Sequence, residues 1–212
     1  MTCQDDLDCP PRRRIRPEVS SNDLPPGRSH DVAPWAEFIS QRIPKGGTYC
    51  EVGVFLGQSL ARMGKLRPDI TLIAIDPWIA EPGAGWEGLG IFQETVAQHG
   101  GDLFLAFLKE MLAKAPDVLR RTQVIRGTAN TVSIYHSFDV LFIDGAHDHT
   151  SVVQDLDAFA ALVKPGGILS GHDYHPDFPG VVRAVDDFEN RKPKLGTPDG
   201  QSPTVWWFDD CR

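Results

Sequence analysis

Residues 48–59 read TYCEVGVFLGQS, and this stretch decides the fold because it joins a short apolar strand to a helix through two nearby glycines. The apolar residues before Gly53 predict the end of a buried strand. Gly53 and Gly57 allow a sharp turn and let a ligand approach the backbone closely. We expect Ser59 to cap a helix over residues 59–66, whose free N–H groups would face the same ligand.

Glu51 distinguishes this turn from a dinucleotide-binding turn. The spacing Glu-x-Gly-x-x-x-Gly-x-Ser lacks the G-x-G-x-x-G pattern that seats a pyrophosphate on a helix N-terminus. A carboxylate at the strand tip would repel a pyrophosphate and attract a cation, such as an amino group beside a sulfonium. The alternative is a tight strand-to-helix turn with a solvated glutamate.

A second strand is predicted by the continuous apolar run over residues 70–75, which suits a strand covered on both faces. Asp76 stands at its carboxyl end, about twenty positions after the glycine turn. Ligands of open parallel sheets bind at such strand ends, and an acid at this place accepts the ribose hydroxyls of a nucleoside. We therefore expect Asp76 to accept both ribose hydroxyls; the alternative is a turn residue before Pro77.

The rest of the chain alternates strands with helices, which predicts a doubly wound α/β domain with a mostly parallel sheet. Further strands are expected over residues 122–125, 138–143, 168–170 and 204–208, and helices over residues 31–43, 102–115, 150–162 and 181–189. A tight return is expected over residues 164–167. The strand at 204–208 comes late enough to be added antiparallel to the sheet.

Two segments stand apart from this alternation. Residues 1–29 are rich in Pro, Arg, Asp and Ser and have few apolar anchors, so we expect a loose arm before a single domain over residues 30–212. Residues 78–101 are rich in glycine around one short helical stretch. They indicate a mobile lid over the site, or else a surface insertion.

Composition excludes several classes of protein. The formal net charge of −8 leaves no basic face for a nucleic acid backbone. The four cysteines are too scattered for a disulfide scaffold, which favours a reducing cytoplasm. No apolar run reaches membrane-spanning length, and residues 1–20 lack the apolar stretch of a signal peptide. We expect a cytoplasmic protein with a small-molecule partner, no nucleic acid and no membrane contact. The sequence leaves open whether the protein forms homo-oligomers.

The chain resembles the class I S-adenosylmethionine-dependent methyltransferases, and within them the small-molecule O-methyltransferases such as catechol O-methyltransferase and the enzymes that methylate macrolide sugars and antibiotics. The likeness runs from about residue 31 to residue 208. It is carried by the motifs YCEVGVFLGQS, IAIDPW, VLFIDGAH and LVKPGGILSGHDY. The resemblance implies a Rossmann-like fold and S-adenosylmethionine as the cofactor.

The resemblance also assigns residues. It places Glu51, Gly53 and Ser59 around the methionine end of the cofactor, Asp76 on the ribose, and Thr128 with Ala129 near the adenine. It makes Asp144 a metal ligand, with His172 and Asp173 supplying the others, and it makes His147 the base. The family usually has two acids or an Asp-Asn pair where this chain has His172 and Asp173.

The residue types agree with that chemistry. Methyl transfer from a sulfonium requires a positioned acceptor, and a hydroxyl acceptor must lose its proton. Histidine titrates near neutral pH, so His147 is the expected base, although His149 and His175 lie near it in the sequence. Carboxylates at positions 144 and 173 favour Mg²⁺, whereas an imidazole ligand would favour Mn²⁺, Fe²⁺ or Zn²⁺. We expect a hydroxyl of a sugar or natural-product unit as the acceptor.

Three other functions remain open from the sequence. A metal-dependent hydrolase would use His147, His149, His172 and Asp173, but it leaves Glu51 and Asp76 unexplained. A non-catalytic nucleoside-binding domain would keep the fold without the chemistry. A nicotinamide oxidoreductase would need the missing G-x-G-x-x-G pattern.

Overall fold

The computed structural model describes residues 19–25, 32–79, 94, 97–197 and 200–209. The chain forms, in order, η1 (Ser21–Asp23), α1 (Val32–Ser40), β1 (Thr48–Val52), α2 (Gln58–Leu66), β2 (Thr71–Asp76), α4 (Leu103–Lys114), α5 (Pro116–Arg120), β3 (Thr122–Arg126), β4 (Phe138–Ile143), α6 (His149–Phe159), η2 (Ala160–Leu162), β5 (Val163–Gly171), α7 (Pro179–Asp187), η3 (Phe188–Asn190), β6 (Lys194–Leu195) and β7 (Trp206–Asp209).

These strands form one sheet in the order β3-β2-β1-β4-β5-β7-β6. Strands β1 to β5 are parallel, and β7 runs antiparallel to both β5 and β6. The predicted doubly wound α/β fold with a late antiparallel strand is therefore confirmed. In the register, Val52 lies opposite both Ile75 and Ile143, so the carboxyl ends of β2, β1 and β4 are level with one another.

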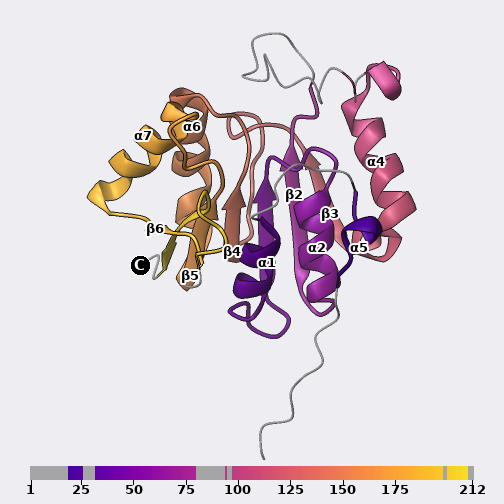
Figure 1. The fold of residues 1–212 in the computed structure, drawn as a ribbon, viewed down its shortest axis with the longest axis horizontal. Helices are drawn as coiled ribbons and strands as arrows, with labels where there is room; N and C mark the ends of the chain where they lie inside the picture. The colour runs from indigo at the N-terminus through magenta and orange to yellow at the C-terminus, as the bar shows by residue number, and fades with distance from the viewer. Residues whose placement is uncertain (1–18, 26–31, 80–93, 95–96, 198–199, 210–212) are drawn as a thin grey trace, which may run out of the picture.

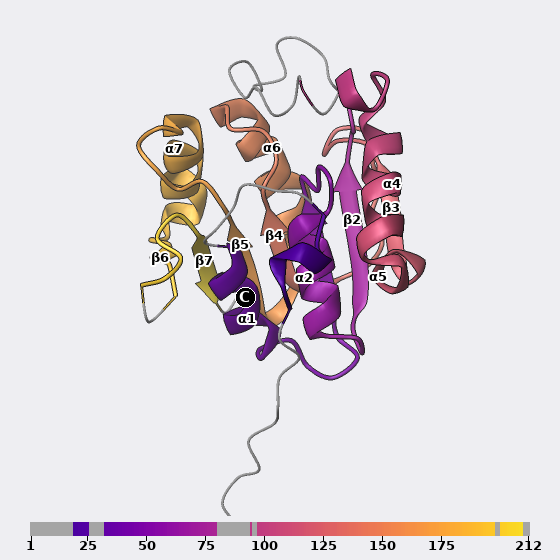
Figure 2. The same cartoon turned by 45° about the vertical axis from the view of Figure 1, so that its right-hand side comes forward.

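Helices cover both faces of the sheet, as the continuous apolar strands require (Figures 1 and 2). Successive residues of β1 point to opposite faces: Tyr49 packs in the cluster with α1, α2, α4 and α5, whereas Cys50 packs in the cluster with α6 and α7. Residues Leu72 and Ile73 of β2 alternate in the same way. The domain thus has two apolar layers with the sheet between them.

Residues 19–25 belong to the packed body, in contrast to the expected loose arm through residue 29. Leu24 is only 3% exposed and lies in the α1–α2 core cluster. The ammonium groups of Lys65 and Lys114 donate hydrogen bonds to the backbone carbonyls of Asp23 and Asn22. Val19 also packs against this cluster, and these apolar contacts with the two hydrogen bonds fix a segment whose composition alone predicts disorder.

Several predicted boundaries differ from the structure. The first helix ends at Ser40 rather than at residue 43, because a turn leads into β1. The expected tight return at residues 164–167 is part of β5, whose pairing with β4 has a register shift between Phe138 and Val140. The short elements α5 and β6 have no counterpart in the sequence prediction.

The predicted lid falls mainly on residues 80–93 and 95–96, which lie outside the described residues. Its first residue, Trp78, is buried against Phe104 and Phe107 and donates from Nε1 to the Phe55 carbonyl at 2.8 Å. The start of this segment is therefore anchored in the core. None of the described helices combines the length and apolar character needed to cross a membrane.

Candidate active site

The tips of β1 and β4 meet at Gly53. The N–H of Gly53 donates to the Ile75 carbonyl at 2.9 Å, and the N–H of Asp144 donates to the Val52 carbonyl at 2.7 Å. Gly53 has a φ of +84°, and a Cβ there would lie 2.2 Å from the carbonyl oxygen of Asp144. Only glycine allows these two strand ends to lie this close, so Gly53 shapes the floor of the crevice.

Asp76 holds the loops around this crevice together. Its Oδ2 accepts the backbone N–H groups of Val54 at 2.7 Å and Phe55 at 2.9 Å, and its Oδ1 accepts that of Trp78. Burial raises the pKa of Asp76, although these three N–H groups act in the opposite direction. The carboxylate therefore fastens the β1–α2 turn to the end of β2.

A cavity of about 290 Å³ opens beside these strand ends. Its walls include Gly53, Asp76, Thr128 and Ala129, which are four residues predicted to contact the cofactor. The tips of β1 and β2 form one side, and the loops after β3 and β4 with one face of α6 form the rest. The structure thus brings together the residues predicted for the ribose and the adenine.

The Glu51 side chain is fully buried and is not among the residues that line this cavity, so its predicted contact with the methionine end of the cofactor stays a prediction. Its Oε2 accepts the Tyr49 hydroxyl at 3.0 Å, and its Oε1 accepts the Ser59 hydroxyl. Burial raises the pKa of Glu51 to about 8, even though the hydrogen bonds from Ser59 and Tyr49 lower it. Glu51 is thus a buried carboxyl that is hydrogen-bonded to two hydroxyl groups beneath the β1–α2 turn.

Ser59 does not cap α2, which corrects the sequence prediction. Helix α2 begins at Gln58, its N-cap residue is Gly57 in the left-handed conformation, and no side chain caps it. The Ser59 hydroxyl is bound to Glu51 instead. A Cβ on Gly57 would lie 2.6 Å from the Met111 sulfur, so Gly57 faces α4 rather than the cavity.

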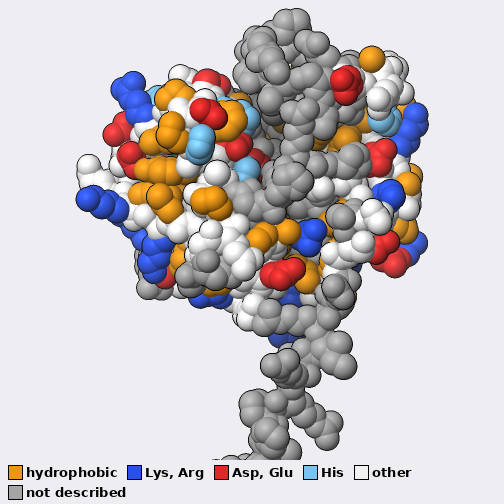
Figure 3. All heavy atoms as spheres, viewed as in Figure 1, with side chains coloured by type: hydrophobic (Ala, Val, Ile, Leu, Met, Phe, Trp, Pro, Cys, Tyr) orange, Lys and Arg blue, Asp and Glu red, His pale blue; other side chains and the backbone are white. Residues whose placement is uncertain are grey.

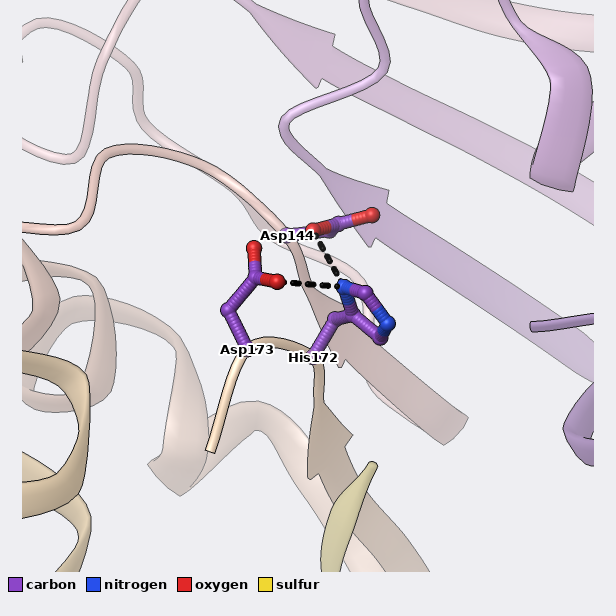
Figure 4. Close-up of side chains that lie close together, drawn as sticks. All are labelled: Asp144, His172 and Asp173. Carbon is purple, nitrogen blue, oxygen red and sulfur yellow. Dashed lines mark ion pairs between the residues drawn. The ribbon is translucent and has the colours of Figure 1, made fainter. Parts of the chain in front are cut away.

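Asp144, His172 and Asp173 form a compact cluster at the ends of β4 and β5 (Figure 4). One possible ligand atom from each residue lies within 4.8 Å of the others. His172 Nδ1 is 3.0 Å from Asp173 Oδ1 and 3.5 Å from Asp144 Oδ1. The three predicted metal ligands therefore converge, as expected for residues at adjacent strand ends.

The other side of the His172 ring is also held. Its Nε2 shares a hydrogen bond of 2.9 Å with the Thr204 hydroxyl, and its backbone carbonyl accepts the Trp206 indole N–H at 3.1 Å. His172 is only 9% exposed. These contacts from the segment before and within β7 fix the ring with Nδ1 toward the two carboxylates, which is the usual arrangement of an oriented metal-binding histidine.

His147 joins this cluster through Asp173. Its Nε2 lies 2.8 Å from Asp173 Oδ2, and its ring packs against Phe178 with centroids 4.4 Å apart. Burial raises the pKa of Asp173, but the contacts with His147 and His172 outweigh it and hold the pKa well below its usual range. Asp173 is therefore an ionised carboxylate shared by two imidazoles. Figure 3 shows histidine and acidic side chains gathered in this region of the molecule, near α6 and α7.

The neighbouring histidines lie elsewhere. His149 Nε2 is 4.0 Å from Asp187 of α7, and His175 pairs with Asp177 at 3.3 Å on the surface. Neither belongs to the metal-ligand cluster found among the described residues. The four-residue set expected for a hydrolase is thus not assembled, because His149 is directed toward α7.

Sequence reasoning missed the wall that α6 contributes to the cavity. Ser151, Gln154 and Asp155 line it together with Asn130, whose amide donates to Gln154 at 3.0 Å. The spacing i, i+3 and i+4 places the three α6 residues on one helix face. That spacing was a usable signal, but nothing in the sequence shows which face turns toward the cavity.

A sequence model of a family described as a methyltransferase domain, Methyltransf_24, matches residues 50–174, which is more than half of the chain. The chain belongs to this methyltransferase family. The matched segment runs from β1 to the residue after Asp173 and contains both the cavity and the Asp144–His172–Asp173 cluster. The protein is thus an S-adenosylmethionine-dependent methyltransferase.

Solved structures similar to this methyltransferase share its fold. The O-methyltransferase NovP is 18% identical, with a TM-score of 0.57 over 87% of this chain and 80% of NovP. A putative rRNA-methylase from Clostridium thermocellum is 12% identical, with a TM-score of 0.59 over 87% of this chain and 100% of that one. CalS11, a TDP-rhamnose 3'-O-methyltransferase of calicheamicin biosynthesis, is 16% identical, with a TM-score of 0.52 over 84% of this chain and 78% of CalS11. At these identities the likeness concerns the fold. A comparison with curated proteins finds no match.

The cavity fits the nucleoside part of the cofactor. It combines a close backbone approach at Gly53, a buried carboxylate at Asp76 and small residues at Thr128 and Ala129. Such a mixture of apolar walls with a few fixed polar groups is typical of small-molecule sites. The described residues of this methyltransferase are therefore compatible with S-adenosylmethionine.

Proposed function

We propose that this methyltransferase transfers a methyl group to a hydroxyl of a small molecule, such as a sugar or a natural-product unit, with a divalent cation held by Asp144, His172 and Asp173. One observation carries the proposal: His147, the candidate base, is bound to a carboxylate of the candidate metal cluster at 2.8 Å. A base and a metal site that share Asp173 suit the activation of a single hydroxyl.

The cofactor is expected to bind with its ribose at Asp76. A carboxylate has about four lone-pair positions, and three of those of Asp76 already accept backbone N–H groups. One position is left, so Asp76 accepts one ribose hydroxyl rather than both. The base then lies toward Thr128 and Ala129, and the methionine end lies toward the metal cluster.

The cluster fits a divalent cation. Two ligands that each lie about 2.1 Å from an octahedral ion are about 3 Å apart, and His172 Nδ1 lies 3.0 and 3.5 Å from the two carboxylate oxygens. Two carboxylates with one imidazole accommodate Mg²⁺ or Mn²⁺. A bound cation of this kind lowers the pKa of a coordinated hydroxyl.

His147 would accept the proton of the acceptor hydroxyl. Asp173 orients the imidazole through Nε2, and Phe178 packs against the ring. A positioned carboxylate also stabilises the imidazolium that forms when the ring takes the proton. His147 and Asp173 thus act as a base and its orienting group, while Asp144 and His172 hold the opposite side of the site.

A small acceptor agrees with the charge of the protein. The formal net charge is −8, and the candidate site itself is rich in carboxylates. Both features oppose the approach of a nucleic acid backbone. By analogy with NovP and CalS11, two structures of the same fold that are described as O-methyltransferases, we propose a hydroxyl as the acceptor.

The test measures formation of S-adenosylhomocysteine with a panel of sugars, polyols, phenols and amines. We expect turnover with a hydroxyl acceptor that stops on chelation and returns with Mg²⁺ or Mn²⁺. His147→Ala should slow turnover by about 10² to 10⁴ without changing the affinity for S-adenosylhomocysteine. The surface variant His175→Ala serves as the control. Turnover with amines alone, or an unchanged rate in His147→Ala, would contradict the proposal.

A further inference from the structure

Asp155 lies in the cofactor cavity on the wall formed by α6. It shares a helix face with Ser151 and Gln154, and all three residues line the cavity. In the sheet, β1 separates β2 from β4, and α6 follows β4. The wall that contains Asp155 therefore lies on the other side of the cavity from Asp76, away from the expected ribose position.

The Asp155 carboxyl faces the β4–α6 loop at close range. Its Oδ2 lies 3.4 Å from the position that a Cβ on Gly145 would occupy. Burial, with a further contribution from the charge of Asp148, raises the pKa of Asp155 to about 7. The described parts of the chain supply no hydrogen bond or ion pair to this carboxyl, and its neighbour Gln154 is already bound to Asn130.

A carboxyl that is largely removed from water and lacks a donor is unfavourable unless a ligand provides the donor. Thr128 and Ala129, beside which the flat base is expected, line the same cavity, and the amide of the next residue, Asn130, donates to Gln154 beside Asp155. The cofactor's adenine carries one strong donor on its edge, the exocyclic 6-amino group. The missing partner and the expected ligand are therefore complementary.

We propose that Asp155 determines the base specificity of the cofactor site by accepting a hydrogen bond from the 6-amino group of adenine. The inference rests on the placement of the cofactor in the cavity described above, and it does not depend on the nature of the methyl acceptor. An ionised carboxylate offers only acceptors. A purine with a 6-keto oxygen would face it with a second acceptor, and a site built to receive a donor rejects such an analogue strongly.

The test compares the binding of S-adenosylhomocysteine with that of its 6-keto analogue, S-inosylhomocysteine, by calorimetry at pH 8. We expect wild-type protein to bind the adenine compound at least about tenfold more tightly. Asp155→Asn should bring the two affinities to within about threefold of each other, because its amide N–H can donate to the keto oxygen. Asp155→Ala should weaken S-adenosylhomocysteine binding by about tenfold.

Asp157→Asn is the matched control, since Asp157 lies on the same helix but lines a different surface recess with Asp187. It should keep the wild-type preference, and circular dichroism should show that each variant is folded. Equal wild-type affinities for the two compounds, or an unchanged preference in Asp155→Asn, would overturn the inference. Failure of the proposed hydroxyl methylation would leave these affinities unchanged, so the two claims fail separately.

Discussion

Glu51 and Asp76 are both carboxyls at strand ends, yet they differ in their hydrogen-bond donors and in their access to the cavity. Asp76 accepts backbone N–H groups and also lines the cavity, whereas Glu51 is sealed beneath the turn by Tyr49 and Ser59. With a pKa near 8, Glu51 is mostly protonated at neutral pH. Glu51 therefore supports the turn as a hydrogen-bonded acid.

This placement predicts a pH-dependent stability. Because the pKa of Glu51 rises from about 4.5 unfolded to about 8 folded, the unfolded chain releases the proton first, and stability falls as pH rises through this window. Glu51→Gln, which does not ionise, should gain stability relative to wild type by roughly 3 kcal/mol between pH 5.5 and pH 8.5.

Urea unfolding of both proteins at the two pH values measures this difference. Glu37→Gln changes an exposed glutamate and should follow the wild-type profile. Parallel profiles of wild type and Glu51→Gln would show that Glu51 ionises at an ordinary pH in the folded protein.

Residue positions were predictable where strand direction alone determines them. Asp144, His172 and Asp173 follow two neighbouring parallel strands, so their meeting follows from the alternation of strands and helices. Ser59 was predicted wrongly because the hydroxyl had two possible partners, and only the burial of Glu51 decides between them. Asp155 was missed for a similar reason, since the orientation of α6 depends on core contacts distant in sequence.

At the scale of elements, helices α2 and α6 differ in whether a side chain caps their first turn. Asp148 caps α6 by accepting the Ser151 N–H at 3.0 Å, whereas α2 begins without a side-chain cap. Free N–H groups at the start of α2 can bind a ligand's anionic or carbonyl group, and those of α6 are partly satisfied by Asp148. Long periodic helices were predictable, but the short elements α5 and β6 depend on tertiary packing.

Residues 19–25 should contribute to the stability of the protein, although their composition suggests a disordered arm. Leu24→Ala should destabilise the protein by about 2 to 3 kcal/mol, because it empties a position that is 3% exposed in the α1–α2 core cluster. Leu195→Ala, at a position that is 50% exposed, should change the free energy of unfolding by less than about 0.5 kcal/mol. Equal, small effects in urea unfolding would mean that the segment is a detached arm.

At the scale of the whole molecule, the two apolar layers hold the sheet so that five parallel strands end along one edge. The cofactor cavity lies at the ends of β1, β2 and β3 and extends along the β4–α6 loop, and the Asp144–His172–Asp173 cluster lies at the ends of β4 and β5. The two sites are neighbours because β1 and β4 are adjacent. Under the proposed function, this arrangement would place the methyl donor beside the site that activates the acceptor.

A crystal soaked with S-adenosylhomocysteine and Mn²⁺ tests this arrangement most directly through its anomalous difference map. We expect one strong manganese peak within about 2.3 Å of Asp144, His172 and Asp173, with the nucleoside in the cavity between Asp76 and Asp155. A nucleoside in that cavity without a manganese peak at the three residues, or a peak at another place, would contradict the account of the site.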